Sequence, residues 1–347
     1  MTRIIPKPSV KQGSNVSSTL VTRKIEFPFV SLVLAYQHES AGKTELIDTN
    51  SSGFIARLYN VFYQELVGPL QPLARFDDAT GLNWASGLGC TSFISKNDCQ
   101  RHCKVLDCAL HRPESRLIVE VGCGLGGYGV HLAKTFDADL LGIDVSTVAV
   151  RLAQDEAAKS DIAARLRFKK ASIERTGLPS GCAAAIVAID SIYLLRNRPA
   201  VTSEVTRLLR PGGILIATTF EAAPVSARDV TWERAFLQRG FTVAARRDVT
   251  RSWRAYMLEK HTLRWQARDL LLEQCGASVE PHLDVSRSIV ESAGDCLAHL
   301  RRWELCLKKP ADEKAVVARR SSTTAASRQT SQGTPAAPQT SADSGHG

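Results

Sequence analysis

The sequence predicts an α/β protein whose centre is a doubly wound sheet of seven strands. From residue 116 onward, short apolar segments alternate with stretches of helical periodicity. The segment 185–189 is apolar on both faces, as expected for a central parallel strand covered by helices on both sides. A chain of 347 residues is long enough to build such a core. The predicted strands are 117–121, 140–143, 166–169, 185–189, 214–218, 241–245 and 302–307.

The helices between these strands have recognisable start signals. Ser146 is a good N-cap for the helix after the second strand, and Pro199 stands at a permitted first-turn position. Right-handed crossovers then place the helices on both faces of the sheet. We expect a helical insertion at about 250–300, before the last strand. The helices predicted after the first and fifth strands cover 127–136 and 228–239, and those of the insertion cover 252–274 and 285–299.

Two helical segments precede the sheet. Phe54, Leu58, Phe62 and Leu66 recur at helical spacing, and Gly68-Pro69 ends that helix. A second helix is expected over 98–110, before Pro113. We therefore expect a helical cap over 51–112 and a main domain over 113–310.

Both ends of the chain are weakly patterned. We expect a poorly ordered extension over 1–50 and a disordered tail over 311–347, which is rich in Ala, Ser, Thr, Gln and Pro. The first 25 residues carry five basic residues and no acid, as in some targeting peptides, but they lack an apolar core and contain little arginine, which favours a disordered cytoplasmic tail over a transit peptide. No apolar run reaches the roughly 20 residues that span a bilayer. We therefore expect a cytoplasmic protein without stable membrane insertion.

The net charge of +9 is spread along the chain without the alternation of basic and aromatic residues typical of nucleic-acid binding. Nucleic acid is therefore not an expected partner. Seven basic residues do fall between Arg246 and Arg268. They fit a solvated helix face, or alternatively a wall of a substrate site that tolerates anions.

The nine cysteines include no paired CxxC motif. One cluster with two histidines resembles a metal site at first sight, but its spacing matches no zinc ribbon or finger. Buried thiols in a reducing compartment explain it better, and no metal is expected. The cluster consists of Cys99, His102, Cys103, Cys108 and His111.

A strand–glycine–strand unit predicts a binding site for an adenosine-containing cofactor. It reads LIVEVGCGLGG over 117–127 and LLGID over 140–144. Gly122 permits a tight exit from the strand, while Gly124 and Gly126 allow close approach of the backbone, with amide N–H groups toward the ligand. Asp144 can accept hydrogen bonds from both ribose hydroxyls. The glycines also satisfy GxGxxG, so a dinucleotide remains open at this point.

Three further features distinguish between the cofactors. Glu120, two residues before Gly122, can anchor a cationic ligand and would repel a pyrophosphate. The fourth strand continues into IDSIY at 189–193, which places polar groups beside the cofactor. The segment EVTRLLRPGG at 204–213 ends a helix abruptly before the fifth strand.

These motifs, in this order, resemble the class I S-adenosylmethionine-dependent methyltransferases over about 55–310, which implies a Rossmann-like domain. The N-terminal helices and GLNWASG at 81–87 resemble the small-molecule branch that includes tocopherol, sterol and natural-product enzymes. The resemblance implies that Glu120 and the glycine loop hold the methionine moiety and that Asp144 binds the ribose. It also implies that Val145, Ser172 and Ile173 contact the adenine. Many relatives carry an acid where Ser172 stands. The implied cofactor-binding residues are Glu120, Gly122, Cys123, Gly124, Gly126, Asp144, Val145, Ser172, Ile173 and Asp190.

Methyl transfer needs alignment and exclusion of water, and a base only where the nucleophile must lose a proton. Asp190 is the candidate base, although it can also hold the methionine end or cap the next turn. Trp84, Tyr63 and Tyr193 are the candidate substrate-binding residues. Arg251 and Arg254 would suit a phosphate or carboxylate on the substrate.

The sequence thus predicts methyl transfer from S-adenosylmethionine to oxygen, nitrogen or carbon of a small molecule in secondary metabolism. The alternatives are carbon methylation of a lipid-like or isoprenoid-like substrate, a nicotinamide-dependent oxidoreductase and a non-catalytic binding module. Protein or nucleic-acid methylation is disfavoured, because DSIY at 190–193 replaces the Asn-Pro-Pro-Tyr type of motif. The oligomeric state stays open.

Overall fold

The computed structural model describes residues 52–82, 84, 88, 92–111, 116–195, 197–222 and 231–311. The predictions of a poorly ordered extension over 1–50 and of a disordered tail after residue 311 lie outside the described residues, as does most of the loop 81–87.

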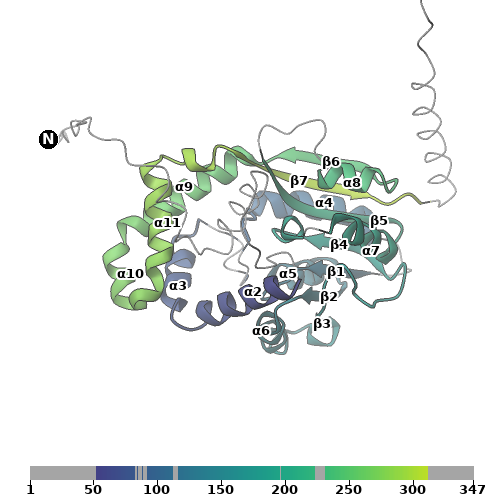
Figure 1. Cartoon of the computed structure of the whole chain (residues 1–347). Coiled ribbons are helices and arrows are strands. Elements are labelled where there is room, and N and C mark those ends of the chain that lie inside the picture. The colour runs from purple at the N-terminus through teal and green to yellow at the C-terminus, as the bar shows by residue number, and fades with distance from the viewer. Residues whose placement is uncertain are drawn as a thin grey trace, which may run out of the picture.

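The described chain forms a seven-stranded sheet in the order β3-β2-β1-β4-β5-β7-β6. The first five strands are parallel, and β7 runs antiparallel to both β5 and β6. The predicted α/β fold with a doubly wound seven-stranded sheet is confirmed (Figure 1). The strands are β1 (Leu117–Val121), β2 (Asp139–Asp144), β3 (Leu166–Lys170), β4 (Ala183–Ala188), β5 (Leu209–Ala222), β6 (Thr242–Asp248) and β7 (Leu300–Lys308).

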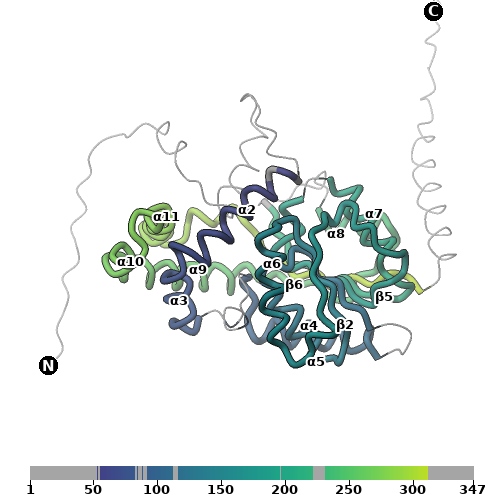
Figure 2. The backbone as a smooth tube through the Cα atoms, turned by 90° about the horizontal axis from the view of Figure 1, so that it is seen from below, coloured from purple at the N-terminus to yellow at the C-terminus, as the bar shows by residue number. Residues whose placement is uncertain are grey.

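Helices cover both faces of the sheet. One core joins α4, α5 and α6 to the first face, and a second core joins α7 and α8 to the other. Figure 2 shows α4 and α5 on the opposite side of the sheet from α7 and α8. The helices are α2 (Ser52–Leu66), α3 (Gln71–Ala79), α4 (Lys96–Leu110), α5 (Gly127–Phe136), α6 (Thr147–Ala157), α7 (Arg198–Leu208), α8 (Trp232–Leu237), α9 (Thr250–Gln266), α10 (Arg268–Cys275) and α11 (Glu280–Glu291), with short 3-10 turns at Ala163–Arg165, Ile192–Leu194, Gly276–Val279 and Asp295–Leu297.

Local signals explain where the helices begin. The Ser95 hydroxyl accepts a hydrogen bond from the Asp98 N–H, and the Asp98 carboxylate accepts one from the Ser95 N–H, which forms a capping box on α4. The Ser146 hydroxyl caps α6, as predicted. Pro199 stands in the first turn of α7, also as predicted. β4 is completely buried and rich in alanine, so helices can pack closely on both of its sides.

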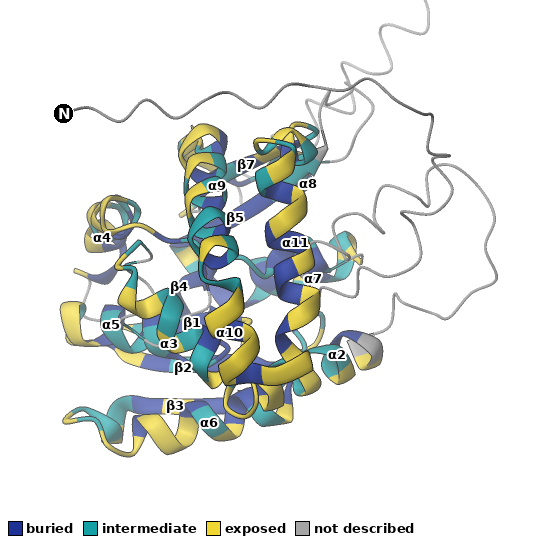
Figure 3. Ribbon diagram, turned by 90° about the vertical axis from the view of Figure 1, so that its left-hand side faces the viewer, coloured by how far each residue is buried: buried dark blue, intermediate teal, exposed yellow. Residues whose placement is uncertain are grey.

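A helical layer lies across the carboxyl ends of the parallel strands. It consists of α2 and α3 from the N-terminal part together with α9, α10 and α11, which are inserted between β6 and β7 (Figure 1). In Figure 3 the central strands are mostly buried, whereas α11 is buried along one side and exposed along the other. None of the described helices is long and apolar enough to cross a membrane.

Two helix predictions in the insertion need correction. The single helix predicted over 252–274 is broken at Ala267 into α9 and α10, although neither Gly nor Pro marks the break. The change of direction allows Leu271 and Cys275 to pack with α3, which local sequence cannot reveal. The helix predicted over 285–299 instead begins at Glu280 and ends at Glu291.

Candidate active site

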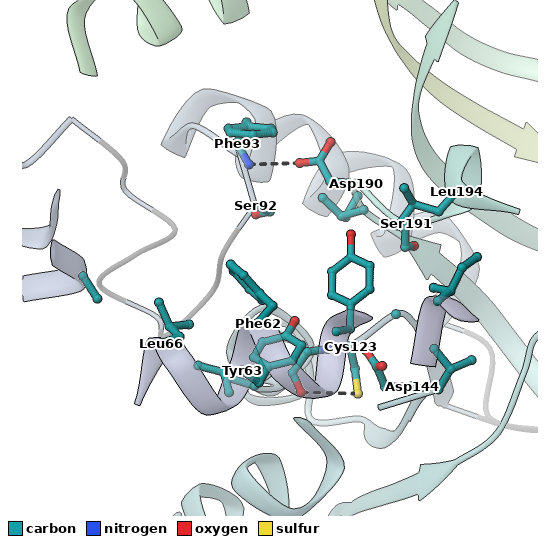
Figure 4. Close-up of a pocket in the computed structure, with 18 of the residues that line it drawn as sticks. Phe62, Tyr63, Leu66, Ser92, Phe93, Cys123, Asp144, Asp190, Ser191 and Leu194 are labelled. Carbon is teal, nitrogen blue, oxygen red and sulfur yellow. Dashed lines mark hydrogen bonds between the residues drawn. The ribbon is translucent and has the colours of Figure 1, made fainter. Parts of the chain in front are cut away.

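A cavity of about 410 Å³ lies between the carboxyl ends of the strands and the helical layer. Its floor comes from the ends of β1, β2 and β4 with the glycine loop, and its roof comes from α2, α3, α9 and α11. The close-up in Figure 4 shows Phe62, Tyr63 and Leu66 on one side of the space and Ser191 and Leu194 on another. The sequence motifs and the helical layer therefore share one cavity.

The glycine loop at the floor has a backbone that only glycine accommodates easily. Gly122 and Gly124 have φ of 66° and 52°, which other residues adopt at a steric cost. A Cβ on Gly122 would lie 2.5 Å from Ser191 Cβ, and one on Gly124 would lie 2.5 Å from the Tyr63 hydroxyl oxygen. The loop therefore lies tightly against β4 and α2.

The amide groups of this loop are used within the protein. Gly122 and Cys123 donate to the Ile143 carbonyl oxygen over 2.8 and 3.1 Å, and Gly124 donates to Asp144 Oδ2 over 3.0 Å. Gly126 donates to the Cys123 carbonyl over 2.8 Å and does not line the cavity. These four amides are therefore not available to a ligand in the described loop. A pyrophosphate would find fewer backbone donors here than a glycine loop usually offers.

Glu120 is a buried acid with an unsatisfied oxygen. It is 5% exposed, it lines the cavity, and its Oε2 has no hydrogen-bond partner among the described residues. Burial raises the pKa of Glu120 to about 8; a Gly129 backbone hydrogen bond lowers it and the Asp144 charge raises it. An orphaned buried carboxyl group is costly, so this site favours a ligand that brings a cation.

Asp144, at the end of β2, holds the loop in place. Its Oδ2 accepts the Gly124 N–H, and its Oδ1 accepts the Ser146 N–H over 2.8 Å. Burial raises the pKa of Asp144, while backbone hydrogen bonds oppose the rise. The carboxylate lines the cavity, and its two oxygens have lone pairs left for further donors such as ribose hydroxyls. Capping and ligand binding are thus compatible at this residue.

The segment after β3 presents alternate residues to the cavity. Ala171 and Ile173 line it, as does Val145 after β2. The Ser172 hydroxyl instead accepts the Glu174 N–H over 3.2 Å, and Ser172 is not among the lining residues. Side chains alternate along an extended backbone, so only one of Ser172 and Ile173 can face the ligand. The structure brings Ile173, and not Ser172, to the candidate adenine position.

Asp190 is fully engaged in protein contacts. Its carboxylate accepts hydrogen bonds from the Arg302 guanidinium, from the Thr218 hydroxyl over 2.9 Å and from the Phe93 N–H over 2.9 Å, the last of which is drawn in Figure 4. Arg302 is itself 3% exposed. Asp190 lines the cavity, but its carboxylate oxygens are occupied by these protein contacts, which agrees with the alternative prediction that it holds the segment after the fourth strand.

The predicted substrate-binding aromatics divide into two groups. Tyr63 and Tyr193 line the cavity. Trp84 does not; its ring packs edge-on against His131 on α5, with centroids 5.3 Å apart. The structure therefore does not place Trp84 in the candidate site. Trp84 packs against the core on the first face of the sheet, whereas Tyr59, Phe62 and Tyr63 of α2 line the cavity.

The predicted anion-binding arginines also lie elsewhere. Arg251 is exposed on α9, and Arg254 donates to the carbonyl oxygens of Ala298 and Leu300 over 2.6 and 2.8 Å. Neither lines the cavity. Two other basic residues of the same run, Lys260 and Arg264, do.

Sequence reasoning missed several residues of the site. Tyr59 and Phe62 lie one turn apart on α2 and line the cavity beside Tyr63. Asn60 ties α2 to the start of α6, because its Oδ1 accepts the Ser146 hydroxyl over 2.7 Å and the Val148 N–H over 3.2 Å. The helical spacing of α2 was visible, but the side chains that face the glycine loop depend on how the helix docks.

The cysteine–histidine cluster on α4 contributes side chains to packing. Cys99 and Cys103 have sulfur atoms 4.0 Å apart, and His102 Nδ1 lies 2.7 Å from the Tyr128 hydroxyl oxygen. Within the described ranges, no group of three or more His, Cys, Asp or Glu side chains is arranged to hold a metal ion.

Comparison with known proteins places this fold and site in a family. Residues 118–213, which carry β1, the glycine loop, β2 and β4, match the family model described as a methyltransferase domain. Residues 118–213 are therefore similar to a methyltransferase domain. The matched region holds the loop and both acids described above.

The chain is similar to several curated proteins over part of their length. It is 28% identical over 178 residues to phosphoethanolamine N-methyltransferase 3 of Arabidopsis thaliana, covering 50% of this chain and 32% of the relative. It is 30% identical over 110 residues to 27-O-demethylrifamycin SV methyltransferase of Amycolatopsis mediterranei, covering 32% of this chain and 40% of the relative. The chain thus spans less than half the length of these relatives.

Solved structures share the fold of this chain. The [4+2]-cyclase SpnF is similar with a TM-score of 0.56 and 21% identity, covering 76% of this chain and 98% of that one. The chain is also similar, with a TM-score of 0.53 and 17% identity, to phosphoethanolamine N-methyltransferase 2 of Haemonchus contortus, which was solved with phosphomonomethylethanolamine and S-adenosylhomocysteine. The match covers 65% of this chain and 56% of that one.

Proposed function

We propose that this protein transfers a methyl group from S-adenosylmethionine to oxygen, nitrogen or carbon of a small molecule in secondary metabolism. The observation that carries the proposal is Glu120, a buried carboxyl group beside the glycine loop whose Oε2 has no partner among the described residues. The methionine end of S-adenosylmethionine carries an ammonium group that would satisfy it. The match of residues 118–213 to a methyltransferase domain supports the same cofactor, and so does Asp144 at the end of β2.

The residues at the floor of the cavity fit this cofactor. Glu120 and the backbone of the loop from Gly122 to Gly124 would hold the methionine moiety, and Asp144 would accept the ribose hydroxyls. Val145 and Ile173 offer apolar contacts for the adenine. When bound, the cofactor supplies an already activated methyl group. The protein's task is then to align the acceptor and to exclude water.

The roof of the cavity supports a small acceptor molecule. We propose that the cap over 51–112 and the insertion at about 250–300 together form the acceptor-binding region. Tyr59, Phe62 and Met257 face the same space. Arg302 engages the Asp190 carboxylate, so the floor of the cavity can position an acceptor more readily than it can remove a proton from it. This favours an acceptor atom that needs little assistance from a base.

The apolar lining also favours an acceptor with an apolar body, so carbon methylation of a lipid-like or isoprenoid-like molecule remains within the proposal. A nicotinamide cofactor is not supported, because the loop amides are occupied and Glu120 would repel a pyrophosphate. We place the reaction in the cytoplasm as part of the same proposal.

Calorimetric titration tests the cofactor directly. S-Adenosylmethionine and S-adenosylhomocysteine should bind, NAD should not, and Glu120→Gln should weaken S-adenosylmethionine about tenfold or more through loss of a charge-assisted contact. Binding of NAD without S-adenosylmethionine would overturn the proposal.

Methyl transfer needs its own measurement, because a protein named as a cyclase shares this fold. A metabolite extract of the host, incubated with the protein and methyl-labelled S-adenosylmethionine, should yield a small molecule that carries the label by mass spectrometry. Label found only in protein or nucleic acid would contradict a small-molecule acceptor.

A further inference from the structure

A second charged group lines the part of the cavity formed by α3, α9 and α11. Asp77 comes from the last turns of α3, Lys260 and Arg264 lie one turn apart on α9, and His282 comes from the start of α11. His261 lies beside them. These helices face the carboxyl ends of the strands across the cavity (Figure 1). The group is therefore separate from Glu120, Asp144 and Asp190 on the floor.

One carboxylate serves two cations in this group. Arg264 donates from Nε to Asp77 Oδ1 over 2.8 Å and from Nη2 to Oδ2. Lys260 Nζ lies 3.2 Å from the same Oδ2. For Lys260 this is the single hydrogen-bonding contact within the part of the chain that the structure describes. Lys260, Arg264 and Asp77 are all mostly buried, and their charges sum to about +1, whereas Asp78, which also lines the cavity, is exposed to solvent that screens its charge.

The neighbouring histidines do not compensate for that charge. The Ser286 hydroxyl donates to the His282 carbonyl over 2.9 Å, so its oxygen accepts from His261 Nδ1 over 2.9 Å. That leaves His261 Nε2 unprotonated in the neutral ring. Burial lowers the pKa of His261 far below its usual value and that of His282 to about 3, and the Arg264 charge lowers both further. Neither ring adds a charge near neutral pH.

The space between the charged group and the floor is apolar. Side chains of α2, α3, α9 and α11 line it, and such a lining suits the body of an apolar molecule. An unmatched positive charge at the far end suits an anion at the end of that body. The apolar lining residues are Leu66, Leu70, Leu73, Met257 and Val285.

We infer that Lys260 and Arg264 recognise a carboxylate at the end of an apolar acceptor molecule, whose other end meets the floor of the cavity. This inference rests on the proposed function and names its substrate class. A carboxylate matches the net charge of the group, because one negative charge neutralises the excess positive charge. A phosphate monoester would bring nearly two negative charges and leave the buried group with an excess of negative charge.

The group also sets the pH range over which the carboxylate is held. Burial lowers the pKa of Lys260 to about 8; the Arg264 charge lowers it further, and Asp77 opposes both. The charged or titratable groups around Lys260 are Asp77 and Asp78 of α3, Arg264 and His261 of α9, and His282 of α11. Burial raises the pKa of Asp77, but Arg264 and Lys260 outweigh burial and hold it at about 2. Carboxylate affinity should therefore fall above about pH 8.

A binding experiment with defined probes tests the inference without any turnover. Octanoate, octanamide and octyl phosphate are titrated calorimetrically at pH 7 in saturating S-adenosylhomocysteine, which occupies the proposed cofactor site. Octanoate should bind, and octanamide should bind at least about tenfold more weakly because it lacks the charge. Equal affinities of octanoate and octanamide would overturn the inference, and a preference for octyl phosphate would overturn the assignment of a carboxylate.

Two variants of α9 complete the experiment. Lys260→Met removes the unmatched charge and leaves the Asp77–Arg264 pair neutral, so the fold should persist and octanoate should bind about tenfold more weakly. Arg251→Met removes a positive charge from the exposed side of the same helix and should leave octanoate affinity unchanged. Equal losses in both variants, or none in Lys260→Met, would overturn the inference.

The failure of the inference and the failure of the proposed function give different results. If S-adenosylmethionine binds and the three probes do not discriminate, the inference fails and the function stands. If octanoate binding depends on Lys260 while S-adenosylmethionine does not bind, the cofactor proposal fails and the carboxylate site stands. Lys260→Arg provides an independent check, because its octanoate affinity should remain constant between pH 7 and 9 while that of the original protein falls.

Discussion

Arg302 and Asp190 form a buried ion pair that joins β7 to the end of β4. Arg302 Nη2 lies 2.8 Å from Oδ1 and 2.9 Å from Oδ2 of Asp190, and both side chains are less than a tenth exposed. The Thr218 hydroxyl and the Phe93 N–H complete the contacts of the carboxylate. The pair therefore fixes the segment after β4 relative to an antiparallel strand more than a hundred residues later in the chain.

Removing one partner of this pair should destabilise the protein strongly. Asp190→Asn or Arg302→Met leaves a buried charge without its partner and should lower the free energy of unfolding by about 3–5 kcal/mol. Urea unfolding followed by circular dichroism measures the change. The double variant should recover part of the loss, because neither charge then remains. A stable Asp190→Asn protein that binds the cofactor normally but has lost all turnover would restore the role of a base.

The pH dependence of stability should reveal Glu120. Burial raises its pKa to about 8 in the folded protein, above the ordinary value of 4.5 that applies on unfolding. The stabilisation from the neutral acid is complete below about pH 4.5 and is lost as the pH rises toward 8, by up to about 1.4 kcal/mol per pH unit. Urea unfolding at several pH values measures the free energy of unfolding, which should decline less steeply with rising pH in Glu120→Gln than in the original protein. An unchanged slope would mean that Glu120 is ionised in the ligand-free protein.

Cofactor binding should release a proton from the same residue. At pH 7 a Glu120 with a pKa of about 8 is mostly protonated, and an approaching ammonium group favours the carboxylate. Titrations of S-adenosylmethionine in phosphate and in Tris buffer should differ in apparent enthalpy, since the two buffers take up the proton with different heats. The difference should disappear in Glu120→Gln. Identical enthalpies for the original protein in both buffers would contradict a protonated Glu120.

The loss of cofactor affinity caused by Gly124→Ala should be partly reversed by Tyr63→Phe. Gly124→Ala costs about 1–2 kcal/mol for the left-handed backbone and adds a clash with the Tyr63 hydroxyl. We expect about tenfold weaker binding of S-adenosylhomocysteine. Tyr63→Phe in the same protein removes the oxygen that lies 2.5 Å from the added Cβ, while the ring carbon Cζ at 3.4 Å can stay. Part of the affinity should return, with Tyr63→Phe alone as the control.

Local patterns predicted the sheet and the floor of the site, whereas long-range contacts stayed hidden. The strand before Gly122 and the acid at Asp144 are adjacent to their glycine loop in sequence, so short motifs describe them. Asp77 and Arg264 are 187 residues apart, and their pairing depends on how α3 meets the insertion. The basic run over 246–268 favoured a solvated helix face, with an anion-tolerant wall as the alternative, and it did not show which of its members face inward.

The misplaced predictions have a similar cause. Trp84 precedes the sheet closely in sequence, yet its ring packs on His131 of α5 and does not line the cavity. The break at Ala267 has no Gly or Pro to mark it, because tertiary packing of Leu271 on α3 decides it. Conversely, Ser172 and Ile173 were indistinguishable by motif, and the alternation of an extended backbone separates them.

The contact between Tyr63 and Gly124 has a kinetic consequence. A ligand that approaches the Gly124 backbone meets the Tyr63 hydroxyl, and Asn60 holds the same helix against the start of α6. We therefore expect cofactor exchange to include a step in which α2 moves. The observed association rate should then level off at high ligand concentration at the rate of that motion. In Asn60→Ala the plateau of the observed association rate should rise, and the cofactor should dissociate faster by a similar factor. Helix α2 would then control the residence time of the cofactor more than its affinity.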